Sequence, residues 1–185
     1  MTGITSSISI ASNALLLLGS NPLSSFSEGT TQATLASNLY ETSYLGLLTS
    51  HRWRFATKQA RLARLSEKPL NGYEYAFQIP SDCIYVIKPS VGDYEVYESL
   101  IHANATEILL DYTYKVEESA LPPYFTQALE FLLAAKFAVP LAGSLDKADF
   151  YFKQYEAQLK RAKYADSSQR PSDIVDDSTF ITERY

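Results

Sequence analysis

The chain has 185 residues, of which 46% are hydrophobic and 20% charged, and its net charge at pH 7 is −5. This length and composition indicate one globular domain with a buried core. With this net negative charge, the chain lacks the overall basic character that many nucleic-acid-binding proteins have. A single cysteine, Cys83, excludes an intramolecular disulfide and a zinc site built on several cysteines.

The longest apolar run near the N-terminus, residues 14–18, is far shorter than the roughly 20 residues that a membrane span needs. No Lys or Arg precedes it, so it lacks the basic start of a secretory signal. We therefore expect a soluble protein that is not exported and does not bind membranes.

An apolar period of three to four residues predicts a first helix over 6–19 that ends at Gly19. The same period, which begins at Ala33, predicts a second helix over 30–64. In its last part, 51–64, apolar and basic residues mix without one clear face. This part either continues the helix or is an extended segment whose aromatic side chains pack on the helices.

From residue 73 the apolar period changes to two, which predicts a small antiparallel sheet or pair of hairpins over 73–116. Two further helices are expected over 122–141 and 146–164. The sequence then turns polar and acidic. The predicted fold is α+β: a domain over 1–165, predominantly a bundle of about four helices with this small inserted sheet, followed by an extended C-terminal tail over 166–185.

Charge is distributed unevenly along the chain. Residues 1–50 contain no Lys or Arg, residues 51–69 carry six bases against Glu67 for a net +5, and residues 70–120 carry nine acids against two lysines for a net −7. Blocks of opposite sign favour self-association or partner docking, with solvated helix and strand faces as the alternative.

The sequence contains no pattern typical of a catalytic or cofactor site. His51 and His102 have no metal ligand or base at a useful spacing, and the glycines form no phosphate-binding loop. Cys83 lies in an apolar run, which is typical of a buried small side chain. We expect no enzyme, no cofactor and no metal; an acid–base pair brought together only by folding is the alternative.

The basic stretch over 51–64 also contains aromatic residues, a combination that stacks on bases or holds phosphates in some proteins. Its bases are candidates for inter-subunit or channel-facing contacts: Arg52, Arg54, Lys58, Arg61 and Arg64. The aromatic residues expected in the core are Phe26, Trp53, Phe55, Phe77 and Phe125.

Several segments carry a resemblance to a known family. The first segment, residues 12–26, is an Asn-Leu-rich stretch that ends in Leu-Gly, a polar pair, Pro and a short apolar loop. The segment 51–56 has the sequence His-Arg-Trp-Arg-Phe-Ala. The segment 75–83 has the sequence Tyr-Ala-Phe-Gln-Ile-Pro-Ser-Asp-Cys. Together with 30–48 and 122–165, these segments resemble, in order, the tail tubular protein A family, the head-to-tail adaptors (gatekeepers) of short-tailed bacteriophages. In the family the second segment usually reads His-Pro-Trp-Asn-Phe-Ala, so Arg52 and Arg54 depart from it.

The resemblance implies a structural virion protein. Family members form a dodecameric ring beneath the portal protein, extend the channel for the genomic DNA and present a platform for the distal tail (nozzle or tail tube), sometimes with tail fibres. This implies a place at the head-to-tail junction of the virion, and in the host cytoplasm during assembly. A head-completion or tail-terminator ring protein of a long-tailed phage is the alternative.

For such a ring we expect two contacts. The −7 block of one subunit would face the +5 block of its neighbour. The tail would dock on the portal, so deletion of 167–185 would abolish portal binding and leave the helices folded. The apolar tail positions expected to make this contact are Ile174, Val175, Phe180, Ile181 and Tyr185.

Overall fold

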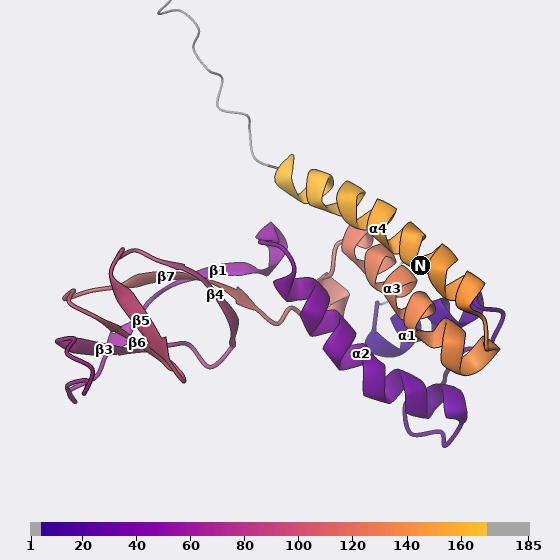
Figure 1. Ribbon diagram of the computed structural model, residues 1–185, viewed down its shortest axis with the longest axis horizontal. Coiled ribbons are helices and arrows are strands. Elements are labelled where there is room, and N and C mark those ends of the chain that lie inside the picture. Colours follow the sequence, from indigo (N-terminus) through magenta and orange to yellow (C-terminus); the bar gives the residue numbers. More distant parts are fainter. Residues whose placement is uncertain (1–4, 170–185) are drawn as a thin grey trace, which may run out of the picture.

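The computed structural model describes residues 5–169 and shows an elongated molecule with a helical unit at one end and a β unit at the other (Figure 1). The helical unit consists of α1 (Ser7–Leu17), α2 (Thr31–Thr49), α3 (Pro123–Ala142) and α4 (Leu145–Ser167). The β unit consists of β1 (Thr57–Arg61), β2 (Ala63–Arg64), β3 (Tyr75–Gln78), β4 (Cys83–Pro89), β5 (Tyr94–Tyr97), β6 (Leu100–Ala103) and β7 (Leu109–Tyr114). Two short 3₁₀ turns, η1 (Arg54–Ala56) and η2 (Glu118–Ala120), flank the β unit.

Local sequence signals set the helix ends. Ser6 and Ser9 form a reciprocal capping box at the start of α1, and the Thr30 hydroxyl accepts the N–H of Ala33 at the start of α2. Between α3 and α4 the chain reverses at Gly143, whose φ of 58° is left-handed and favours glycine.

The centre of the helical unit is α3, which packs against α1, α2 and α4. It is the one helix in the described part of the chain that is long and apolar enough to cross a membrane. Its polar side chains bond to the neighbouring helices: Lys136 Nζ donates to Ser43 Oγ (2.8 Å), and Glu130 Oε1 accepts from Asn13 Nδ2 (2.7 Å). We therefore interpret α3 as the central helix of this bundle.

The β unit contains two antiparallel sheets, with strand orders β1-β7-β4 and β2-β3-β6-β5. The extended chain over 57–64 serves both sheets, because β1 pairs with β7 and β2 pairs with β3. The strands enclose a second core, separate from that of the helices, whose fully buried members include Phe77, Ile101, Ile108 and Leu110.

The predicted helical bundle with one small inserted sheet is wrong. The described residues form seven strands in two sheets, and these have a hydrophobic core of their own. The second helix, predicted over 30–64, ends at Thr49, and the alternative of an extended segment holds for 51–64. The Trp53 indole N–H and the Ser50 hydroxyl both donate to the Leu47 carbonyl, which satisfies a group that the helix end leaves free.

The other predicted helices match the observed ones closely, but α4 continues to Ser167, beyond the predicted start of the tail at 166. The remaining tail residues, 170–185, lie outside the described residues.

Candidate interaction surfaces

The segment 51–56, called the waist here, connects the helical unit to the β unit. Trp53 is fully buried, and its ring meets Phe125 edge-on at 5.2 Å between centroids. Phe55 contacts Phe125 in the same way at 5.1 Å. The waist therefore inserts its aromatic side chains into the helical core while the chain continues into β1.

A buried carboxylate ties the end of α4 to the waist. Asp166 is 1% exposed; it accepts the Arg54 backbone N–H at 2.9 Å and the Tyr124 hydroxyl at 3.0 Å. Burial, together with the hydrogen bond to Asp166, raises the pKa of Tyr124 to about 12. The sequence pattern places Asp166 at the start of the tail, and no local pattern marks its partners, so this role could not be predicted.

A hollow of about 610 Å³ opens beside Asp166 and is lined by waist residues His51, Arg52 and Arg54. Partial burial and the nearby Lys163 lower the pKa of His51, which favours its neutral form. Its ring lies edge-on against Trp53 at 4.9 Å, so His51 acts as part of the waist packing.

Three of the predicted contact bases form ion pairs within the chain. Arg52 pairs with Asp111 (2.7 Å), and Arg61 pairs with Glu107 (3.0 Å). Each pair joins the +5 block to the −7 block of the same molecule. The Arg61–Glu107 pair is largely exposed and the Arg52–Asp111 pair partly so, and each therefore contributes at most about 1 kcal/mol to stability.

Lys58 makes the third pair, with Asp82 (2.8 Å), and lies over the Tyr114 ring at 3.9 Å from its centre. Its hydrogen bond lowers the pKa of Asp82. Among residues 5–169, Arg54 and Arg64 form no ion pair; Arg64 lies over the Tyr75 ring. Pairing of these blocks between neighbouring subunits stays a prediction, and it now depends on the bases that are not already paired.

The five aromatic residues expected in the core divide between the two units. Trp53 and Phe125 are fully buried in the helical core, and Phe26 and Phe55 pack partly buried against it. Phe77 is fully buried as well, but in the core of the β unit.

An acidic cluster, formed by Glu41, Glu117 and Glu118 around Lys115, lies where α2 meets the chain that leaves the β unit. Lys115 Nζ is 2.7 Å from Glu41 Oε1, and this hydrogen bond raises the pKa of Lys115. Tyr40 approaches Glu118 at 3.5 Å. One cation faces three carboxylates, so the cluster keeps a net negative charge.

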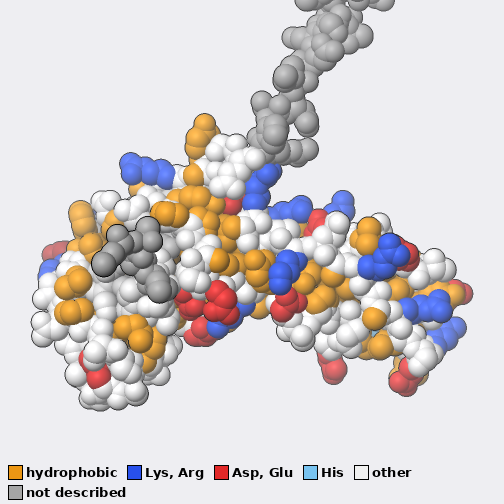
Figure 2. All heavy atoms as spheres, turned by 180° about the vertical axis from the view of Figure 1, so that it is seen from behind, with side chains coloured by type: hydrophobic (Ala, Val, Ile, Leu, Met, Phe, Trp, Pro, Cys, Tyr) orange, Lys and Arg blue, Asp and Glu red, His pale blue; other side chains and the backbone are white. Residues whose placement is uncertain are grey.

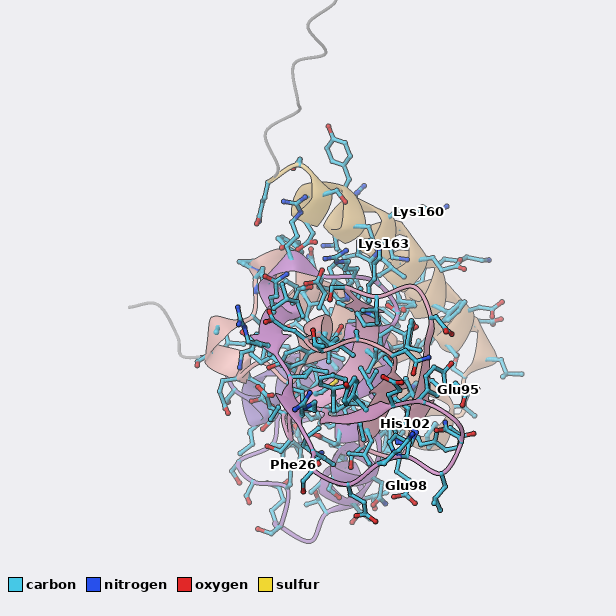
Figure 3. All side chains as sticks on the ribbon, turned by 90° about the vertical axis from the view of Figure 1, so that its left-hand side faces the viewer. Phe26, Glu95, Glu98, His102, Lys160 and Lys163 are labelled. Atoms are coloured by element: carbon cyan, nitrogen blue, oxygen red, sulfur yellow. The ribbon has the colours of Figure 1, made fainter. Side chains whose placement is uncertain are left out.

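The outer face of α4, opposite the face that packs on α3, carries a stripe of exposed side chains. Positions spaced three or four apart lie on one side of a helix. They make up the α4 stripe: Phe150, Lys153, Ala157, Lys160, Arg161 and Tyr164. Phe150 is 55% and Tyr164 is 78% exposed. In Figure 3, Lys160 lies on α4 near the edge of the molecule, well apart from Glu95 and Glu98 of the β unit.

A groove of about 850 Å³ lies between the two sheets and is lined in part by β4 and β5. Cys83 borders it, and burial raises the pKa of this thiol, which disfavours the reactive thiolate.

His102 lies elsewhere in the β unit, where its ring nitrogen is hydrogen-bonded to the Asn71 side chain (3.1 Å) and its ring stacks on Tyr97. Residues 5–169 contain no group of three or more His, Cys, Asp or Glu arranged to hold a metal.

Two comparisons with known proteins found no relative. No family model matches the chain. No curated protein is significantly similar to it. The tail positions expected to contact a partner, from Ile174 to Tyr185, lie outside the described residues.

Proposed function

We propose that this protein is a head-to-tail adaptor of a bacteriophage: the subunit of a ring that lies between the portal protein and the distal tail and surrounds the DNA channel. The proposal starts from the ordered set of segments that resemble the tail tubular protein A family. It is supported by the structural use that the chain makes of those same segments.

The observation that carries most weight is the position of the segment 51–56. This resembling segment forms the waist, where Trp53 and Phe55 pack on Phe125. The departures from the family, Arg52 and Arg54, do not disturb this packing: Arg52 pairs with Asp111 and the Arg54 backbone N–H binds Asp166.

Two other resembling segments form tight turns. In 12–26, Ser12 Oγ accepts the Leu23 N–H at 2.9 Å, and Gly19 takes a left-handed φ of 80°. In 75–83, Asp82 binds Lys58 of β1 and the hydroxyl of Tyr112 of β7, which fixes the start of β4 to both strands. The shared residue types thus specify turns and junctions, as expected of a resemblance in fold.

The shape of the subunit suits a ring between two different partners. A head-to-tail ring needs two unlike faces on each subunit, and a connector needs two further ends that meet other components. The elongated arrangement of two units with separate cores offers such ends, and the acidic cluster and the α4 stripe are unlike faces of the helical unit.

The test is the native mass of the purified chain, alone and mixed with the portal ring encoded in the same genome. We expect a species near 20.7 kDa for the free chain and, on the portal, one added copy for each portal subunit. Binding to a tail-tube ring in place of the portal would favour the tail-terminator alternative. Binding to neither ring would contradict the proposal.

A further inference from the structure

The α4 stripe is an unpartnered surface with a mixed aromatic and basic character. Its helix packs on α3 through the opposite face, where Gln158, Ala162 and Asp166 are buried. Lys153, Lys160 and Arg161 form no ion pair among residues 5–169. Exposed aromatic rings, and Arg beside them, are typical of a surface that is covered in an assembly.

The other side of the helical unit has the opposite charge. Residues 1–50, which include α1 and α2, contain no Lys or Arg. Glu28 remains anionic down to low pH, because hydrogen bonds from the Ser24 backbone and the Ser24 and Thr30 hydroxyls lower its pKa to about 2. The acidic cluster adds Glu41 and Glu117, both exposed.

The two surfaces face different directions. α3 lies between α2 and α4, so the cluster beside α2 and the stripe on α4 are separated by the width of the bundle (Figure 1). In Figure 2 several Lys and Arg side chains lie along the upper edge of the molecule and several Asp and Glu side chains along the lower edge, with both signs mixed at the right-hand end. Complementary surfaces on different sides of one subunit favour a head-to-tail contact.

We propose that the α4 stripe of one copy docks on the acidic cluster of a second copy, and that this contact closes the ring. The inference rests on the proposed function, because the ring supplies the second copy. Lys160 and Arg161 would face Glu41 and Glu117 of the neighbour, while the Phe150 and Tyr164 rings are shielded from water.

Nucleic acid is the competing occupant of a basic, aromatic helix face. The acidic cluster favours a second copy, because it keeps a net negative charge and gives every copy of the chain a surface that complements these bases. Asp149 and Glu156, on the adjoining exposed side of α4, would repel phosphates and carboxylates alike, so they do not distinguish the two occupants. The experiment therefore includes duplex DNA as a separate arm.

The test is a charge swap. One variant carries Lys160→Glu and Arg161→Glu; a second carries Glu41→Lys and Glu117→Lys; a third carries all four changes. A control carries Lys88→Glu, an exposed position within the −7 block of the β unit, where an added acid does not weaken pairing with a basic neighbour. Circular dichroism and thermal unfolding verify that each variant folds. Ring completion on the portal is counted by native mass spectrometry, and self-association of the free chain at high concentration is followed by sedimentation.

We expect each two-site variant to raise the protein concentration needed for ring completion by about tenfold or more, as like charges then meet across the contact. The four-site variant should restore assembly, and the control should behave as the original chain. Rings that form normally with Lys160→Glu and Arg161→Glu would overturn the inference and leave the adaptor proposal standing. If that variant loses binding to duplex DNA while its rings still form, the inference is likewise overturned and the stripe is assigned to DNA binding.

A failure of the proposed function gives a different result. A chain that ignores the portal but self-associates at high concentration, with the same charge-swap pattern, would refute the adaptor role and support the contact. A chain that ignores the portal and stays monomeric at every concentration would overturn both.

Discussion

Trp53 is the side chain that contributes most to joining the two units. Its indole N–H donates to the end of α2, its ring contacts α3, and its own backbone leads through η1 to β1. Every buried side-chain nitrogen and oxygen among residues 5–169 has a hydrogen-bond partner, so the junction is satisfied as well as packed.

We expect Trp53→Ala to lower the free energy of unfolding by about 3–5 kcal/mol, because it leaves a large cavity and removes the indole hydrogen bond to the Leu47 carbonyl. Urea unfolding followed by circular dichroism measures the change. Phe150→Ala removes a ring from an exposed position and should change stability by less than about 0.5 kcal/mol. Equal effects of the two substitutions would refute the role given to Trp53.

Asp166→Ala should cost about 1–3 kcal/mol, because it leaves the Arg54 N–H and the Tyr124 hydroxyl without their acceptor. Asp149→Ala removes the same group from an exposed position on α4 and serves as the control. Amide exchange at Arg54 should become faster in the first variant alone. Unchanged protection at Arg54 would show that this contact does not hold the end of α4.

At the scale of the elements, the loop between α1 and α2 provides a test of pH dependence. The pKa of Glu28 is lowered from 4.5 to about 2 by hydrogen bonds to Ser24 and Thr30. A carboxyl group with a lowered pKa stabilises the fold above its unfolded pKa, and this contribution is lost as the pH falls through the folded pKa. The contribution of Glu28 is therefore complete above about pH 4.5 and declines toward pH 2.

We expect Glu28→Gln to be less stable than the original chain at neutral pH and to lose less stability between pH 5 and pH 2. Urea unfolding across that range measures both slopes. Glu67→Gln, an exposed position outside this loop, should keep the slope of the original chain. A steeper acid dependence in Glu28→Gln would contradict the assignment.

Sequence patterns predicted the elements whose signals are local. Ser6 and Thr30 cap helices as their residue types suggest, and the period of two predicted strands within 73–116. The failure at β1 has a physical cause: Lys58 to Arg61 are good helix formers, and pairing with β7, about fifty residues further along, overrides that preference. Asp166 binds Arg54, 112 positions away, and no local pattern reveals such a contact.

At the scale of the whole molecule, the structure moves the boundary of the tail. A deletion that begins at 167 removes the last residue of α4, so it tests folding and docking together. A chain that ends at Gln169 keeps Asp166 and its two hydrogen bonds, whereas a chain that ends at Ala165 loses them.

We expect the chain ending at Gln169 to keep the melting temperature of the full chain and to lose portal binding, if the tail makes that contact. The chain ending at Ala165 should melt several degrees lower, as about 1–3 kcal/mol of stability is lost. Differential scanning calorimetry and co-sedimentation with the portal ring distinguish the two effects. Full portal binding by the shorter chains would assign docking to the described residues.

The chain enters and leaves the β unit at adjacent places, since Thr57 pairs with Thr113 across the β1–β7 ladder. The segments that connect α2 to β1 and β7 to α3 therefore start from neighbouring positions. β4 and β7 contact the helical unit at this junction, through Ile84 and Tyr114, whereas β5 and β6 do not. We therefore expect changes of length in β5 and β6 to leave α2 and α3 in place. The far end of the β unit is thus the part of the molecule that can vary in length and shape while the helical framework keeps its spacing.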